Sequence, residues 1–275
     1  MLKKLEPINK VYQKRWQKIK ETLKKEKLLI HQIGNDVTLN DCASIISNWG
    51  ALPVMAHFQK EAVQIVKDAS TLVLNIGTLT EKRLDSILAA GKKANQLGIP
   101  VIFDPVGAGG AEYRTKAAEK ILAELKIAVI KGNEGEIAAL SGEDTEVKGI
   151  TSIAEHAQIE LTAQKLAAEL NTIVVVSSEN DIITDGIRIK IITRGSSMLA
   201  EVVGTGCMLG STLGVFAAAV DSEFSIFEAA ETAVYYYGLA AEIAELKADT
   251  PAKFKLEFMD NIYLLQNNNS LLDKL

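Results

Sequence analysis

The sequence predicts an α/β fold built on a mostly parallel sheet, and three observations support this prediction. Short apolar runs rich in β-branched residues alternate with segments of helical periodicity along most of the 275 residues. These runs contain few polar residues, which is typical of strands buried on both faces. One pair of runs flanks an Asp-Gly dipeptide, which predicts an antiparallel hairpin at an edge of the sheet.

The N-terminal segment, residues 1–27, is predicted to form an amphipathic helix. Tyr12, Trp16, Ile19 and Leu23 recur at helical spacing within a run of lysines. Because acidic residues interrupt this positive charge, we favour a helix that docks its apolar stripe on the rest of the chain over one that binds a membrane surface.

Strands and helices alternate through the first two-thirds of the chain. The expected strands are Leu28–Ile33, Thr71–Ile76, Val101–Asp104, Ile127–Lys131 and Thr172–Ser177. The expected helices are Leu39–Trp49, Glu61–Ala69, Glu81–Leu97, Thr115–Leu125 and Leu161–Leu170. Right-handed crossovers between parallel strands would place helices on both faces of the sheet.

The last third of the chain begins with the hairpin, Asp181–Thr193, whose turn is expected at Asp185-Gly186. Three further helices are expected at Gly206–Val220, Phe227–Leu246 and Phe254–Leu265. The run Tyr235–Tyr237 could pack on the sheet or on another molecule, and periodicity does not distinguish these. No linker or repeat divides the sequence, so residues 1–275 are predicted to form a single domain.

Composition argues against several classes of function. The net charge of -5 offers no excess of basic residues for a nucleic-acid backbone. No segment has the character of a membrane span or of a secretory signal. Cys42 and Cys207 stand far apart in unrelated contexts, so no disulfide is expected and a reducing cytoplasm is the predicted location.

Three segments at strand or hairpin ends carry residues suited to phosphate chemistry. Gly204–Cys207 opens an apolar helix, whose free amide groups could face a phosphate. Asp104 ends a buried strand and precedes a glycine-rich loop, where a carboxylate could hold Mg²⁺. Lys131 and Glu136 flank a third strand end, although Asn133 or Glu136 could simply cap the following helix.

Each of these segments alone has a structural explanation as a turn or a helix cap. Together they place carboxylates, a cation and free amides at one edge of a sheet, which is the set that phosphoryl transfer requires. The sequence contains no Gly-x-x-x-x-Gly-Lys-Ser/Thr loop, so a P-loop enzyme is excluded. The residues therefore favour a small-molecule kinase that uses ATP without a P-loop.

These motifs, in this order, resemble the hydroxyethylthiazole kinase family of the ribokinase-like superfamily, from about His31 to Tyr263. The segments that carry the resemblance are Ala51–His57, Leu74–Thr80, Asp104–Gly109, Lys131–Leu140 and Gly204–Met208. The resemblance implies a three-layer α/β/α sandwich and a homotrimer with active sites at the subunit interfaces. The implied reaction transfers phosphate from ATP, with Mg²⁺, to the hydroxyl of 5-(2-hydroxyethyl)-4-methylthiazole, giving ADP and the thiazole phosphate for thiamine salvage.

The resemblance also implies roles for individual residues. The substrate side would include Asn35, the backbone amide of Met55, and Gly204, and the ATP side would include Lys131, Asn133, Ser177 and Thr205. Asp104 and Glu136 match the carboxylates that hold Mg²⁺ and phosphate in the family. The family carries Arg where this chain has Lys131 and Thr where it has Ser177, so the nucleotide contacts would differ.

Cys207 occupies the position at which sugar kinases of the superfamily carry an aspartate as general base. A thiol is a poor base unless the start of the helix depresses its pKa, so slow turnover dominated by positioning is expected. Cys207 could instead act by its size, leaving room for the substrate hydroxyl.

Three alternatives stay open at this point. An ATP-dependent dehydratase of the same superfamily would normally carry an aspartate in place of Cys207. Another kinase of the superfamily, acting on hydroxymethylpyrimidine, pyridoxal or a sugar, is disfavoured by Pro53–His57 and by Cys207. A binding protein that has lost turnover is disfavoured because Asp104 and Glu136 are both present.

Overall fold

The computed structural model describes residues 5–142 and 152–268, except for the side chains of residues 152–157, and shows one eight-stranded sheet of order β2-β1-β3-β4-β5-β6-β7-β8. The strands are β1 (Leu29–Ile33), β2 (Leu52–Val54), β3 (Thr71–Asn75), β4 (Val101–Asp104), β5 (Val129–Asn133), β6 (Ile173–Ser177), β7 (Asp181–Thr184) and β8 (Ile189–Ile192). All pairings from β2 to β6 are parallel, and β7 and β8 add an antiparallel edge. The predicted fold class is therefore confirmed.

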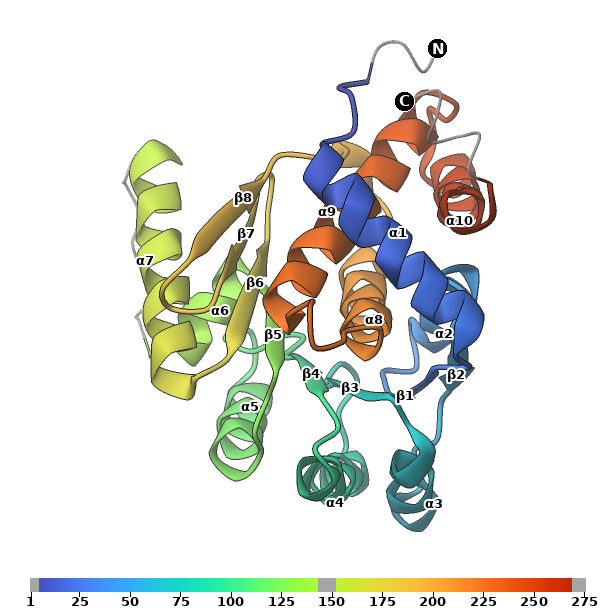
Figure 1. Ribbon diagram of the computed structural model, residues 1–275. Helices are drawn as coiled ribbons and strands as arrows, with labels where there is room; N and C mark the ends of the chain where they lie inside the picture. The colour runs from blue at the N-terminus through green and yellow to red at the C-terminus, as the bar shows by residue number, and fades with distance from the viewer. Residues whose placement is uncertain (1–4, 143–151, 269–275) are drawn as a thin grey trace.

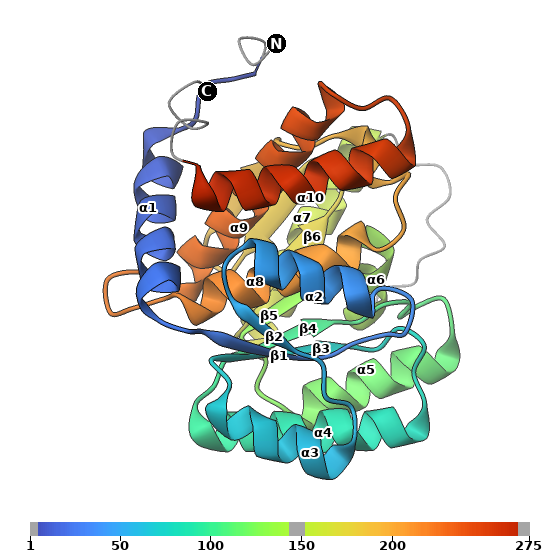
Figure 2. The same cartoon turned by 90° about the vertical axis from the view of Figure 1, so that its right-hand side faces the viewer.

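Helices cover both faces of the sheet (Figures 1 and 2). One face packs against α3 (Gln59–Ile65), α4 (Glu81–Leu97), α5 (Glu112–Glu124), α6 (Glu134–Leu140) and α7 (Ser152–Leu170). The other packs against α1 (Lys10–Lys25), α2 (Leu39–Asn48), α8 (Thr205–Ala218), α9 (Ile226–Glu245) and α10 (Pro251–Asn267). Successive strand residues alternate between the two cores, so Leu72 faces the α4 layer and Val73 faces the α8 layer. The result is a three-layer sandwich.

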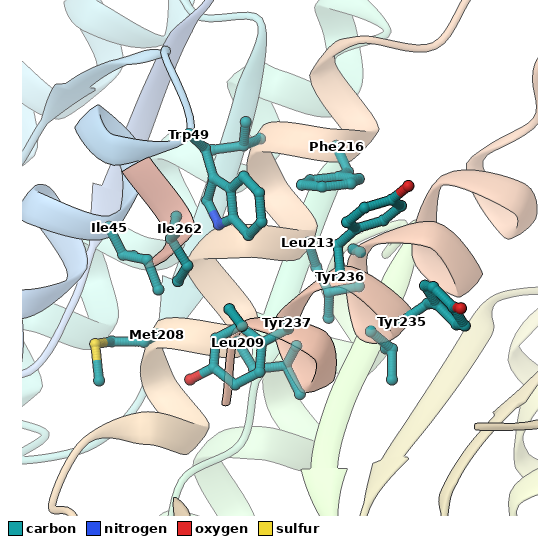
Figure 3. Packing of buried hydrophobic residues seen from close by; sticks show 14 of the residues in the cluster. Ile45, Trp49, Met208, Leu209, Leu213, Phe216, Tyr235, Tyr236, Tyr237 and Ile262 are labelled. Carbon is teal, nitrogen blue, oxygen red and sulfur yellow. The ribbon is translucent and has the colours of Figure 1, made fainter. Parts of the chain in front are cut away.

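The N-terminal helix docks on the α8 side of the molecule as expected, but it is shorter than the predicted segment 1–27. It begins at Lys10, after the N-cap Asn9, and ends at Lys25, and residues 1–4 lie outside the described residues. The four residues of its apolar stripe are all buried, and Trp16 is only 1% exposed. The Trp16 ring stacks on Phe216, with centroids 5.4 Å apart, and also contacts Trp49 and Tyr236. Figure 3 shows Trp49, Phe216 and Tyr236 together in this cluster. The stripe therefore joins α1 to the core between α8 and α9.

The three consecutive tyrosines of α9 are buried within the chain. Tyr235 stacks on Tyr12 of α1, and Tyr236 lies in the cluster around Trp16. The Tyr237 hydroxyl donates a 2.5 Å hydrogen bond to the carbonyl oxygen of Thr205 at the start of α8. Packing inside the molecule therefore accounts for all three rings.

Several element boundaries differ from the sequence prediction for physical reasons. β2 was not predicted, because it is a three-residue edge strand that contains Pro53. The expected helix Glu61–Ala69 ends as a short 3₁₀ turn, Val66–Asp68. α5 and α7 begin three and nine residues earlier than expected, at Glu112 and Ser152.

The hairpin turn is shifted by one residue from its expected place. Asp185 N–H donates to the Arg188 carbonyl oxygen, so these two residues close the turn. The central residues are then Gly186 and Ile187 rather than Asp185 and Gly186. Gly186 has φ 89°, and a left-handed residue at the first central position suits a tight hairpin.

No helix in the described ranges combines the length and apolar character that crossing a membrane requires.

Candidate active site

Polar residues from neighbouring strands meet at the carboxyl edge of the parallel sheet, against the start of α8. Asn35 follows β1, Asn75 ends β3, Asp104 ends β4 and Lys131 lies in β5; all four are buried. β2 lies beside β1 on one side, and the chain then crosses to form β3 on the other side of β1. The order of the strands therefore reverses between β1 and β3. Open α/β sheets bind ligands at such a reversal, outside the carboxyl ends of the strands.

The start of α8 lies against this group because glycines allow a close approach. Gly204, the N-cap, has φ 97°, and a Cβ there would lie 2.8 Å from Cγ2 of Thr38. A Cβ on Gly206 would lie 3.1 Å from Nζ of Lys131. The Thr205 hydroxyl donates to the carbonyl oxygens of residues 199 and 202, which fixes the turn before the helix. The free amides of the first helical turn form a site suited to an anion.

Asp104 is a buried carboxylate with one oxygen unpaired. Its Oδ2 accepts a 2.7 Å hydrogen bond from Nδ2 of Asn75. Its Oδ1 has no hydrogen-bond partner among the described residues and lies 3.7 Å from Nζ of Lys131. Burial raises the pKa of Asp104 to about 6, although the Lys131 ammonium acts in the opposite direction.

Lys131 remains a cation in this setting. Burial alone would lower its pKa, but the carboxylates of Asp104 and Glu136 more than offset burial and raise the pKa above its usual value. The site therefore holds a fixed positive charge next to the amides of α8.

Glu136 connects two of the glycine-rich strand ends. Its Oε1 accepts a 2.9 Å hydrogen bond from Gly107 N–H, and its Oε2 accepts one of 2.9 Å from Asn133 N–H. Asn133 Oδ1 accepts from Glu136 N–H at 2.8 Å, which completes a capping box at the start of α6. The capping role considered from the sequence is thus present, and the cap occupies the Asn133 side-chain oxygen.

Cys207 is the third residue of α8 and faces both asparagines. Its Sγ accepts hydrogen bonds from Nδ2 of Asn35 at 3.4 Å and of Asn75 at 3.3 Å. Burial, followed by the charge of Asp104, raises the pKa of the Cys207 thiol. The helix start therefore does not depress this pKa, and the thiol is protonated at neutral pH.

Two predicted residues flank this central group. Met55 follows β2 at one end of the parallel sheet and packs partly against the core on the α8 side. Ser177 ends β6 at the other end, and its hydroxyl donates a 3.3 Å hydrogen bond to the Gly132 carbonyl oxygen. Of the residues expected on the substrate side, Asn35 and Met55 thus lie toward the β1–β2 end of the sheet edge, whereas the expected ATP residues of β5 and β6 lie toward its other end. Gly204 and Thr205, one from each set, are neighbours at the start of α8.

Asn75 is the residue that sequence reasoning missed. It was recognised only as part of a motif, with no role assigned. The available signal was the one that identified Asp104, a polar residue that ends a buried strand. Its contacts with Asp104 and Cys207 place it at the centre of the site.

The donor set suits a cation shared with a phosphate rather than one held by protein alone. The described ranges contain no group of three or more His, Cys, Asp or Glu side chains that could hold a metal ion. The unpaired, buried Oδ1 of Asp104 nevertheless fits a hard cation such as Mg²⁺, which keeps several waters and binds through one or two carboxylates and phosphates.

Comparison with known proteins gives consistent matches over most of the chain. Residues 20–268 match the model of the hydroxyethylthiazole kinase family. The chain is 44% identical over 245 residues to hydroxyethylthiazole kinase of Thermoanaerobacter pseudethanolicus, covering 88% of this chain and 92% of that protein. It is 42% identical over 247 residues to the enzyme of that name from Chloroflexus aurantiacus, covering 90% and 91%.

Solved structures agree with this result. A structure of hydroxyethylthiazole kinase from Pyrococcus horikoshii OT3 is similar with a TM-score of 0.82 and 33% identity, covering 91% of this chain and 93% of that one. A ribokinase-like superfamily protein from Enterococcus faecalis V583 shares the fold with a TM-score of 0.63 and 15% identity, covering 90% and 94%.

Proposed function

The chain belongs to the hydroxyethylthiazole kinase family, and from this premise we propose that it phosphorylates 5-(2-hydroxyethyl)-4-methylthiazole with ATP, giving ADP and the thiazole phosphate in thiamine salvage. The observation that carries the proposal is the pairing of Asp104, with its free Oδ1, and charged Lys131 beside the start of α8. This arrangement combines a cation, a carboxylate and free amides where the γ-phosphate would react.

We assign the thiazole alcohol to the β1–β2 side and ATP to the β5–β6 side of the sheet edge. Asn35, Met55 and Gly204 would contact the thiazole, and its hydroxyl would lie by Cys207. Lys131, Asn133, Ser177 and Thr205 would contact the nucleotide, with Asn133 able to offer its Nδ2 because the cap uses its oxygen. The amides of α8 and the ammonium of Lys131 would stabilise charge on the transferred phosphoryl group.

Asp104 and Glu136 are the residues that we propose would hold Mg²⁺, directly or through water. A cation held there would supply positive charge that offsets the charge of the phosphates. Asp104 offers its free Oδ1, and Glu136 is already oriented by two backbone N–H groups. The chain thus keeps both carboxylates in fixed positions before the nucleotide binds.

The reaction assigned here does not need a strong base. Phosphoryl transfer passes through a loose transition state in most analyses, so positioning and charge stabilisation supply most of the rate. A protonated Cys207 is compatible with this, because it leaves space for the hydroxyl. We therefore favour a role in size and placement for this thiol.

We also propose a cytoplasmic homotrimer in which residues 1–275 form one kinase domain and the active sites lie between subunits. Support comes from three apolar side chains close in sequence to the proposed substrate residues: Val37, Phe58 and Val203 are 64%, 67% and 73% exposed. A neighbouring subunit would cover them. Light scattering during gel filtration tests the trimer.

A coupled assay of ADP release tests the activity directly. Wild-type protein with Mg²⁺ and ATP would be given the thiazole alcohol, hydroxymethylpyrimidine or pyridoxal in parallel. We expect thiazole-dependent release only. Release with another alcohol would overturn the substrate assignment, and ATP binding without release would indicate a binding protein.

Substitution of Cys207 tests whether a missing base limits the rate. If a missing base limits the rate, Cys207→Asp should preserve or raise kcat, because the two asparagine N–H donors at Sγ would stabilise a carboxylate there. If Cys207 acts by its size, as we favour, the same substitution should lower kcat. Cys207→Ala should keep kcat within about tenfold if the thiol is not the base. The control is Cys42→Ala, in the other buried cysteine, with unchanged kcat expected. Complete loss in Cys207→Asp would favour a purely steric role.

The raised pKa of Asp104 predicts an acidic limit to activity. Because the carboxylate is the form that holds Mg²⁺, kcat/KM should fall as the pH drops below about 6. The measurement is kcat/KM from pH 5 to pH 9, with circular dichroism at each pH as the control for folding. A flat profile down to pH 5 would contradict an essential ionised Asp104.

A further inference from the structure

Two buried asparagine side chains connect the strand ends on which the proposed site is built. Asn35 Nδ2 donates to Asn75 Oδ1 at 3.0 Å, and Asn75 Nδ2 donates to Asp104 Oδ2 at 2.7 Å. Both Nδ2 groups also donate to Sγ of Cys207. One continuous set of hydrogen bonds therefore runs from the loop after β1 through β3 to β4 and α8.

Backbone groups fix the orientation of both amides. Asn75 Oδ1 accepts a 2.9 Å hydrogen bond from Gly77 N–H, and Asn35 Oδ1 accepts from the N–H groups of Val37 and Thr38 at 3.0 and 3.1 Å. A backbone N–H can only donate, so each side-chain oxygen must point to its loop. Each Nδ2 must then point into the site, and neither amide can be reversed without losing these bonds.

The conformations of the loops after β1 and β3 keep Asn35 and Asn75 in contact. A Cβ on Gly77 would lie 2.8 Å from Cβ of Asn35, so a larger residue would separate the two loops. Arg83 donates to the Thr78 carbonyl oxygen and pairs with Asp36 at 2.8 Å, which ties the loops together. Thr78 has φ 43°, an unusual backbone for a β-branched residue. Such strain persists where the surrounding structure enforces it.

The consequence for Asp104 is that its two buried oxygens face different partners. The amide of Asn75 occupies Oδ2, which leaves Oδ1 as the oxygen turned toward Lys131. Without the amide, the carboxylate could rotate about its last bond, since that torsion is broad. Asn75 therefore decides which carboxylate oxygen faces the phosphate side.

We propose that Asn75 is a positioning residue that sets the direction of the Asp104 carboxylate. The inference rests on the proposed kinase activity. Asn75 acts on the reaction through Asp104, and its own atoms need not contact the phosphate.

A double-mutant cycle tests this role. We expect Asn75→Leu to lower kcat by about 10²-fold, the cost typical of misplacing a reacting group, while KM for the thiazole changes by less than about threefold. In an Asp104→Asn background, the same substitution should lower kcat by less than about threefold further, because the group it positions has already been disabled. A purely structural defect would lower kcat equally in both backgrounds.

Two further proteins control for damage to the strand. Thr71→Val alters a buried polar residue at the opposite end of β3, whose hydroxyl has no hydrogen-bond partner within the described residues, and should leave kcat unchanged. Asn75→Ala replaces Asn75→Leu if the leucine variant fails to fold, as judged by circular dichroism. A wild-type kcat in either folded Asn75 variant, or an undiminished loss in the Asp104→Asn background, would overturn the proposal. A wild-type protein without thiazole-dependent turnover would instead overturn the proposed function on which it rests.

Discussion

Asp104→Asn should lower kcat by about 10³-fold while the dissociation constant of the thiazole alcohol changes by less than about threefold. The substitution preserves shape and an oxygen atom but removes the charge that a cation needs. The wild-type carboxylate lies at the end of β4 with its Oδ1 free. Because the proposed thiazole side of the site lies toward β1 and β2, its binding contacts should remain intact.

Asp181→Asn provides a matched control for this experiment. Asp181 is half-buried at the start of β7, and desolvation raises its pKa to about 7. Asparagine therefore resembles the protonated form that Asp181 already adopts in part at neutral pH. The Asp181 carboxylate accepts a hydrogen bond from Ser178 N–H, on the antiparallel side of the sheet. We expect kcat within about threefold of wild type, because the charge of Asp181 is the weakest of those that act on Lys131.

The two readouts are coupled ADP release for kcat and isothermal titration calorimetry for thiazole affinity. Equal losses of kcat in Asp104→Asn and Asp181→Asn would mean that both carboxylates support folding, and that the loss in Asp104→Asn does not report on the chemistry. A kcat near that of wild type in Asp104→Asn would refute the assignment of this carboxylate to Mg²⁺ and phosphate.

The sequence predicted Asp104 as a site residue but did not predict which residues contact it. A charged residue that ends an apolar strand run is an unusual local feature, so it could be recognised without a structure. Asn75 ends β3 in the same way, yet it carries no charge and its partner Cys207 lies 132 residues away in the chain. Such a contact depends on the order and register of strands, which local patterns do not fix.

The ionisation of Cys207 illustrates a conflict between local and tertiary effects. The local rule is that the start of a helix favours a thiolate. The hypothesis that Cys207 acts as a base depended on this effect. In the folded chain, burial and the adjacent Asp104 act in the opposite direction and prevail. Neither effect can be read from residues 204–208, because both require β4 to lie beneath α8.

The N-terminal helix was predictable in more detail because its signal is entirely local. Four apolar residues at helical spacing define the buried face whatever they pack against. The pattern did not predict the surface against which this helix packs. The aromatic cluster around Trp16 contains Trp49 at the end of α2, Phe216 of α8 and Tyr236 of α9.

Trp16→Ala should reduce the free energy of unfolding by about 3–5 kcal/mol, the range measured for removing a large buried aromatic side chain. Trp16 is 1% exposed and contacts three other aromatic rings. Its removal would leave a cavity between α8 and α9 that rigid neighbours cannot fill. Urea unfolding followed by far-UV circular dichroism measures the change.

Val11→Ala is the control within the same helix, because Val11 is 55% exposed and lies outside the buried apolar stripe. It should change stability by less than about 0.5 kcal/mol. A loss below about 1 kcal/mol in Trp16→Ala would show that α1 is not an integral part of the core.

The same experiment distinguishes global from local loss of stability. If α1 detached alone, a minor transition in helical signal would precede the main one, as expected for a unit that opens independently. We expect a single transition instead, because α1 is held along its length. Tyr12 stacks on Tyr235, Arg15 pairs with Glu228 and Glu231, and Lys20 donates to the Leu265 carbonyl oxygen of α10. Undocking α1 would expose the shared aromatic cluster of α8 and α9, so its loss should unfold the whole layer.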